Sequence, residues 1–169
     1  EDKLFEEMDG QEYFSALKDN VLFCSVVDGW GFRLKELAAM FSPRFKMDPL
    51  QLKQYMWGDN YFNPNTKRIT TEQPTPESQP IFVQFALGSI FKAYNAVKEQ
   101  DLKTVQVISK TFEFAMPPTN TDIKKDRQQY LSTFMHNWMP VETALCHMIA
   151  EKLPSAKEAQ RKRISNIVP

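Results

Sequence analysis

The sequence predicts an α+β fold in which helices dominate. Over most of the chain, apolar residues recur at the three- and four-residue spacing of amphipathic helices. Only one short apolar run is rich in β-branched residues, and one Pro-Asn-Thr triplet favours a small hairpin. With 169 residues, 42% of them apolar, the chain is long enough to bury a core. We therefore expect about five or six helices, one buried strand and one hairpin.

The first elements are a strand and a helix. Residues 21–27 form the β-branched run, which is bounded by Asp28-Gly29 and predicts a buried strand. Apolar residues at helical spacing over 34–41 then predict a helix directly after a turn that contains Gly29 and Gly31. The expected order is strand, turn, helix.

A second helix and the hairpin follow. Asp48-Pro49 supplies an N-cap and a first-turn proline, which predicts a helix over roughly residues 49–57. Residues 61–63 and 67–70 flank the turn-forming triplet and predict the two hairpin strands. The proline-rich residues 72–80 predict a loop.

The second half of the chain shows four helical patterns. The first is apolar around most of its circumference, so we expect it to be largely enclosed and to form the centre of the core. The last begins at Pro140 and carries an apolar seam formed by Val141, Ala144, Leu145, Met148 and Ile149. The predicted ranges are 81–97, 101–112, 123–138 and 140–153.

Charge is balanced overall but uneven at the two ends. The 21 acidic and 21 basic residues cancel, so no global field attracts nucleic acid or lipid, and we expect no DNA partner. Residues 1–19 form an acidic leader, whereas a basic cluster lies within residues 154–169. We interpret that segment as a solvated linker, with a phosphate-contacting patch as the alternative. The basic cluster consists of Lys157, Arg161, Lys162 and Arg163.

The sequence contains neither a membrane-spanning run nor a signal peptide. No stretch approaches the roughly 18 consecutive apolar residues that a bilayer requires, and the acidic first residues differ from a secretory leader. We therefore expect an intracellular, soluble protein without a membrane partner. The chain starts at Glu1, which suggests a piece of a longer protein.

Few residues are candidates for catalysis or metal binding. Neither His136 nor His147 has a partner at the spacing of a helical metal site. Cys24 and Cys146 are interpreted as small buried hydrophobes. The phosphate-loop motif is absent, so we expect no nucleotide hydrolysis by this chain alone. One unusual feature is Ser25, which lies where the predicted strand enters a glycine-containing turn. The least favoured hypothesis is an enzyme with its own pocket between helices.

Three segments together resemble the middle of the elongation factor 2-like translational GTPases. Each segment alone is a weak signal, but their common order and spacing extend the resemblance over roughly residues 13–164. The segments are residues 20–32, which end in Asp28-Gly29-Trp30-Gly31-Phe32; residues 56–64, which begin Met56-Trp57-Gly58-Asp59-Asn60; and Trp138-Met139-Pro140 followed by Lys152-Leu153-Pro154-Ser155.

The resemblance implies a topology that periodicity does not give. Residues 20–34 and 139–153 would contain the last strand and the closing helix of a P-loop GTPase (G) domain. Residues 35–138 would form the inserted G prime subdomain, made of helices and a small β-hairpin. Residues 1–19 would remain an acidic leader, and residues 154–169 would be a linker toward the next domain.

The resemblance also implies where a guanine nucleotide binds. In the family, a short serine-containing motif after that last strand lines the guanine pocket, and Ser25, Val26 and Val27 occupy its positions. Val26, at the second position of the motif, replaces the small residue that is usual in the family. A backbone N–H at this position can still donate a hydrogen bond to the guanine carbonyl, because that bond does not depend on the side chain. GTP or GDP with Mg²⁺ would bind the full-length protein. We expect no catalytic residue, metal or cofactor in this chain alone.

The implied function is work on the ribosome. The turn at Asp28-Gly29-Trp30 is most similar to the corresponding turn in the branch of the family that matures the large (60S) subunit in the cytoplasm. In that branch, GTP-driven rearrangement with a partner protein releases an anti-association factor. Elongation factor 2 itself is the alternative, and the spliceosomal relative ranks third. A nucleotide-independent module that contacts rRNA or stalk proteins is a further hypothesis. Its candidate contacts are Lys67, Arg68, Arg161, Lys162 and Arg163.

Overall fold

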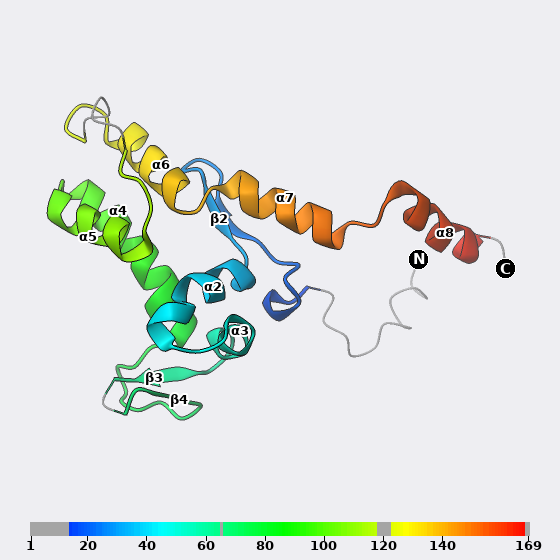
Figure 1. Cartoon of the computed structure of the whole chain (residues 1–169), viewed down its shortest axis with the longest axis horizontal. Coiled ribbons are helices and arrows are strands. Elements are labelled where there is room, and N and C mark those ends of the chain that lie inside the picture. Colours follow the sequence, from blue (N-terminus) through cyan, green and yellow to red (C-terminus); the bar gives the residue numbers. More distant parts are fainter. Residues whose placement is uncertain (1–13, 65, 118–122, 168–169) are drawn as a thin grey trace.

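The structure is a computed structural model that describes residues 14–64, 66–117 and 123–167. These residues form a helix-rich α+β fold with seven α-helices, one short 3₁₀ helix, one π-helical segment and two antiparallel sheets of two strands each (Figure 1). The predicted α+β class is confirmed, with more helices and one more strand pair than expected. Residues 1–13 of the predicted leader lie outside the described residues. Within the described part, no helix has both the length and the apolar character needed to cross a bilayer.

The described chain begins with a hairpin, whose first strand confirms a strand within residues 21–27 but is shorter than predicted and is not buried. After a 3₁₀ helix, η1 (Ala16–Lys18), strand β1 (Phe23–Ser25) pairs antiparallel with β2 (Trp30–Phe32). Gly29 permits the reversal because its φ of 74° lies in the left-handed region. β1 is only partly buried, and the residues after it enter an exposed turn.

The two predicted helices that follow are confirmed. α2 (Leu34–Phe45) buries one apolar face, and α3 (Pro49–Met56) packs against it. The Asp48 carboxylate caps α3, since it accepts the N–H groups of Leu50 and Gln51 at 3.0 and 3.3 Å. The buried residues of α2 follow the helical spacing noted over 34–41: Leu34, Leu37, Ala38 and Phe41.

The predicted hairpin is also confirmed. β3 (Tyr61–Asn63) pairs antiparallel with β4 (Arg68–Thr70) and lies beneath α2 and α3 in Figure 1. The Phe62 ring fixes the hairpin to the core, because its centroid lies 5.3 Å from that of Phe45 and 5.7 Å from that of Phe85. Such edge-on ring pairs contribute about 0.5–1.5 kcal/mol each beyond the area that they bury.

The helix predicted over residues 81–97 exists as two segments. η2 (Phe82–Leu87) is π-helical, since the Gly88 N–H donates to a carbonyl five residues earlier, and α4 (Gly88–Lys98) continues it. The prediction that this helix is largely enclosed is wrong, because Phe91 is 60% exposed. Its buried residues lie on the side that packs against α5 and α6.

α5 (Leu102–Phe112) confirms its predicted helix, and α6 (Arg127–Trp138) is shorter than the predicted 123–138. Asp101 and Asp126 cap them by accepting backbone N–H groups of the first turn. Aromatic rings fill the space between the two helices, with centroids 4.9–6.5 Å apart. These rings belong to Phe112, Phe114, Phe134 and Trp138.

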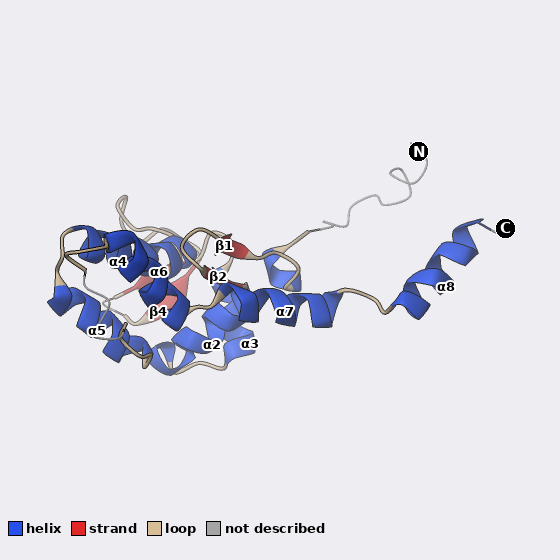
Figure 2. Ribbon diagram, turned by 90° about the horizontal axis from the view of Figure 1, so that it is seen from above, coloured by secondary structure: helices blue, strands red, loops and turns tan. Residues whose placement is uncertain are grey.

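α7 (Val141–Lys152) begins after Pro140 as predicted, but its apolar seam is not buried. Only Ala144 of α7 is fully buried, and Leu145 and Ile149 are exposed. The reason is that α7 packs against β2 and extends away from the rest of the described residues (Figure 2). The seam therefore has no complete partner within the part of the chain that the structure describes.

The predicted linker over residues 154–169 contains a helix, α8 (Ala156–Ile167). Ser155 and Glu158 form a reciprocal cap at its start. The Ser155 N–H donates to Glu158 Oε2 at 2.9 Å, and the Glu158 N–H donates to Ser155 Oγ at 3.4 Å. This cap starts a helix even though the segment has no apolar face.

The β1–β2 hairpin and the start of α7 lie side by side although they are far apart in sequence. The Gly31 N–H donates to the Met139 carbonyl at 2.9 Å, and the Val141 N–H donates to the Gly29 carbonyl at 3.2 Å. A Cβ on Gly31 would lie 3.0 Å from both Cys24 Cβ and Val141 Cγ2. Glycine at this position therefore permits the close approach of the two segments.

Candidate functional site

The predicted guanine-binding residues lie at the tip of the β1–β2 hairpin. Ser25 ends β1, and its Oγ donates to Asp28 Oδ2 at 2.8 Å. Val26 and Val27 follow in the turn and are 76% and 82% exposed. The turn is thus open to solvent at the two valines, and a planar base could approach it there.

Asp28 connects this turn to two helices that are distant in sequence. It accepts a hydrogen bond from the Tyr94 hydroxyl of α4, and Gln128 Nε2 of α6 donates to its Oδ1 at 2.8 Å. Trp30 Nε1 in turn donates to the Tyr94 hydroxyl at 2.8 Å. We call Ser25, Asp28, Trp30, Tyr94 and Gln128 the Asp28 network.

The Asp28 network keeps its central carboxyl group ionised. Burial raises the pKa of Asp28, but the hydrogen bonds from Tyr94, Ser25 and Gln128 together outweigh burial and hold the pKa below its ordinary value. Burial and the neighbouring Asp28 carboxylate raise the pKa of Tyr94. At neutral pH, Asp28 is therefore an acceptor and Tyr94 a donor in one fixed arrangement.

Sequence reasoning found Ser25 but missed the rest of the Asp28 network. Tyr94 and Gln128 lie 66 and 100 residues from Asp28, so no local spacing signals the contact. The described residues contain no group of three or more His, Cys, Asp or Glu side chains able to hold a metal ion.

The predicted contacts Lys67 and Arg68 belong to a basic groove between the β3–β4 hairpin and the end of α2. The groove has a volume of about 710 Å³, and Arg44 and Lys46 extend the basic lining. Among the described residues that line it, four side chains are cationic and none is a carboxylate. The sequence indicated only half of this cluster because α2 and the hairpin meet only in the folded chain. The lining consists of Arg44, Phe45, Lys46, Met47, Tyr55, Phe62, Pro64, Lys67, Arg68 and Ile69.

The other predicted basic contacts lie elsewhere. Arg161 and Arg163 are exposed on α8, and the side chain of Lys162 lies outside the described residues. Figure 1 shows α8 at the opposite end of the molecule from the β3–β4 hairpin. The structure therefore does not unite the two predicted basic groups into one surface.

A third charged cluster stabilises the junction of α2 and α7. The Arg33 guanidinium is fully buried, donates to both oxygens of Glu36 and reaches Glu151 Oε2 at 3.0 Å. Lys35 Nζ donates to the other oxygen of Glu151 at 2.7 Å. Lys35 and Arg33 together lower the pKa of Glu151 to about 2.

Acidification is expected to destabilise the chain partly through Glu151. Its pKa falls from 4.5 in the unfolded chain to about 2 in the folded one. The stabilising effect of the carboxylate is therefore complete above pH 4.5 and is lost as the pH falls through about 2. Glu151→Gln should flatten the pH dependence of the free energy of unfolding in this window, measured by urea denaturation.

Glu77 provides the matched control, since it is an exposed glutamate outside the cluster. Glu77→Gln should leave the slope of stability against pH as in the wild type. Identical slopes for the wild type and Glu151→Gln would contradict the assignment.

The histidines and cysteines do not form a reactive centre within the described residues. His136 Nε2 lies 3.4 Å from Glu142 Oε1, and His147 is exposed. The prediction that Cys24 and Cys146 are buried is wrong, because both thiols are free and exposed. Cys24 alternates outward on β1, and Cys146 lies on the unpacked side of α7.

Comparison with known proteins gives consistent matches over nearly the whole chain. Ribosome assembly protein 1 of Saccharomyces cerevisiae is 34% identical over 158 residues, which cover 92% of this chain and 14% of that protein. The Schizosaccharomyces pombe protein of the same name is 30% identical over 160 residues, and human elongation factor-like GTPase 1 is 28% identical over 160 residues. No family model matches the chain.

The names of these relatives, ribosome assembly protein 1 and elongation factor-like GTPase 1, match the resemblance of the sequence to the elongation factor 2-like GTPases. The chain spans only 14–16% of the length of these relatives.

Proposed function

We propose that this chain forms the end of a GTPase domain together with its G prime insertion, in a protein that acts in assembly of the large (60S) ribosomal subunit. The observation that carries the proposal is the match to relatives named for ribosome assembly and for GTPase activity, over 92–95% of the chain. The proposed setting is late maturation in the cytoplasm, where GTP hydrolysis with a partner protein releases an anti-association factor.

Two structural features support a role as part of a larger domain. The apolar residues Leu145 and Ile149 are exposed on α7, and Val26 and Val27 are exposed on the hairpin tip. β1 is paired with β2 alone within the described residues, so its other edge is free to join a larger sheet. Exposed apolar surface of this kind marks sites that another part of a protein covers.

The same proposal assigns the hairpin tip to the guanine base. Ser25 and the backbone of Val26 and Val27 would contact the base, and the Asp28 network would hold the tip in place. Bound GTP or GDP with Mg²⁺ would supply the phosphate chemistry through residues outside this chain. The segments 20–34 and 139–153 would then belong to the G domain, and residues 35–138 to the G prime subdomain.

The direct test is guanine-nucleotide binding by the full-length protein. Fluorescent GDP should bind the full-length protein with measurable affinity, and the 169-residue chain alone should bind it far more weakly. A full-length protein that retains these residues and binds neither GTP nor GDP would overturn the proposal. Equal affinity of the isolated chain would equally contradict it, because the phosphate-binding residues would then have to lie here.

A second candidate function is supported by the basic groove. A nucleotide-independent module could contact the ribosome through Lys67 and Arg68, which line that groove. The two functions are compatible, since a GTPase on the ribosome needs both a nucleotide site and a docking surface. Elongation factor 2 remains the alternative for the identity of the parent protein.

A further inference from the structure

The basic groove concentrates positive charge on a chain whose net charge is zero. Arg44 and Lys46 come from the end of α2, and Lys67 and Arg68 come from the β3–β4 hairpin. All four side chains are exposed, and none of them forms an ion pair with a described carboxylate. Four unpaired cations around one hollow attract an anionic partner.

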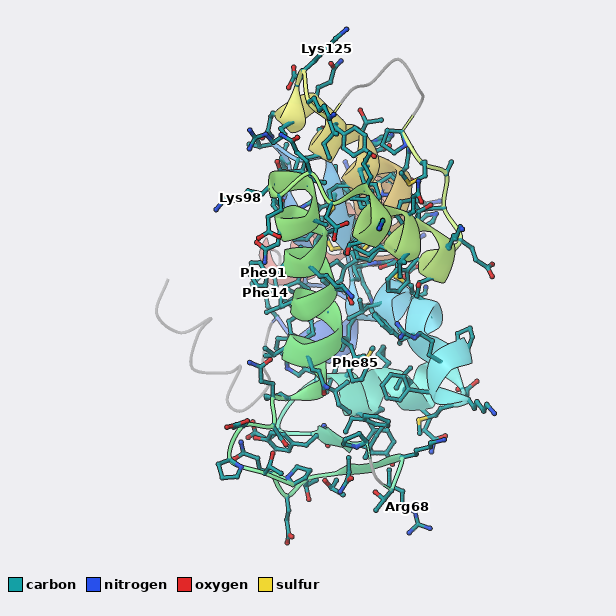
Figure 3. All side chains as sticks on the ribbon, turned by 90° about the vertical axis from the view of Figure 1, so that its left-hand side faces the viewer. Phe14, Arg68, Phe85, Phe91, Lys98 and Lys125 are labelled. Atoms are coloured by element: carbon teal, nitrogen blue, oxygen red, sulfur yellow. The ribbon has the colours of Figure 1, made fainter. Side chains whose placement is uncertain are left out.

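The groove also presents aromatic surface between its cations. Phe62 and Phe45 lie in the lining, and their rings are fixed by T-shaped packing with centroids 5.3 Å apart. Both rings also pack on Phe85, which Figure 3 places between α4 and the hairpin. Tyr55 of α3 is 36% exposed beside them. The packed rings of Phe45 and Phe62 thus form a rigid base of the groove, and the exposed ring of Tyr55 lies at its edge.

We propose that this groove binds single-stranded RNA, with phosphates on the four cations and a base stacked on Tyr55. Single-stranded nucleic acids are bound where a cationic groove follows the backbone and aromatic rings receive the bases. Arginine suits this role because its guanidinium contacts phosphate oxygens in pairs and stacks on planar rings. An acidic protein segment would use the cations but would leave the exposed aromatic ring without a role.

The proposal rests on the proposed ribosomal function and adds to it the kind of molecule that the groove contacts, which is single-stranded RNA. It requires no nucleotide and no residue of the hairpin tip. Failure of RNA binding would therefore leave the guanine-nucleotide test untouched, and failure of nucleotide binding would leave the groove untouched.

The test uses the 169-residue chain and a fluorescein-labelled oligouridylate of about twelve nucleotides, with fluorescence anisotropy as the readout. Lys67→Gln/Arg68→Gln is expected to weaken binding about tenfold or more. It should also reduce the slope of log affinity against log salt by about 1.4, or roughly 0.7 for each lost phosphate contact. Tyr55→Leu, which keeps the charge and most of the bulk, should weaken binding about fivefold or more.

Lys98→Gln/Lys125→Gln is the matched control, because it removes the same charge at the end of the molecule remote from Arg68 (Figure 3). It should change affinity less than about twofold. Equal losses in the two double variants would overturn the proposal. The proposal would also be overturned if Tyr55→Leu bound RNA like the wild type and the wild-type chain bound polyglutamate of the same charge as tightly as the oligouridylate. That result would assign the groove to an acidic protein partner. Circular dichroism establishes that each variant is folded.

Discussion

Arg33→Ala is expected to lower the free energy of unfolding by about 2–5 kcal/mol, because it removes a fully buried side chain, leaves a cavity and takes the cationic partner from two partly exposed carboxylates. Arg33 is the largest fully buried side chain of the described residues. Its guanidinium joins Glu36 at the start of α2 to Glu151 near the end of α7. Without it, two carboxylates converge with only the exposed Lys35 to balance them.

Two further variants separate charge from packing. Arg33→Met fills most of the volume without the charge, so it should destabilise the chain less than Arg33→Ala but still measurably. Lys35→Met removes an exposed partner of the same Glu151 and should cost less than about 1 kcal/mol. Urea denaturation of the 169-residue chain gives all three values. Wild-type stability of Arg33→Met would show that the buried charge contributes nothing.

Local signals explain which elements could be predicted from the sequence. α3 and α5 begin at Asp48 and Asp101, whose capping role is visible from one turn of sequence. β2 was missed because Trp30–Phe32 is too short for a periodic pattern and depends on a backbone hydrogen bond to Met139. α8 was missed because it has no apolar face, although the Ser155 and Glu158 spacing of its cap was present in the sequence.

The candidate sites were predictable only in part for the same reason. Ser25 and the Lys67-Arg68 pair are adjacent to recognisable turns, so the sequence alone indicates them as candidates. Their partners come from other elements, so the hydrogen bond to Tyr94 and the position of Arg44 beside the hairpin required the fold. The assignment of the guanine pocket and of the G prime boundaries remains a prediction from family resemblance.

Asp28→Ala is expected to lower the free energy of unfolding by about 2–3 kcal/mol. The substitution removes the common acceptor of Ser25, Tyr94 and Gln128, and hydrogen bonds to a charged acceptor contribute about 1.5–3 kcal/mol each when well buried. Asp28 is only partly buried, so water replaces some of these bonds and the sum is smaller. Urea denaturation measures the loss.

Variants of the residues that hydrogen-bond to Asp28 show how much each bond contributes to this loss of stability. They also relate the loss to the proposed nucleotide site. Ser25→Ala should cost about 1 kcal/mol, because it removes one bond and leaves the two links to α4 and α6. Tyr94→Phe keeps the ring but breaks the link to α4, so in the full-length protein it should weaken GDP binding by loosening the hairpin tip without touching the base. Gln106→Ala, an exposed change on α5, serves as the control and should leave both stability and GDP affinity unchanged. If Asp28→Ala and Tyr94→Phe lost stability but bound GDP like the wild type, the network would be purely structural and the tip would be positioned by other residues.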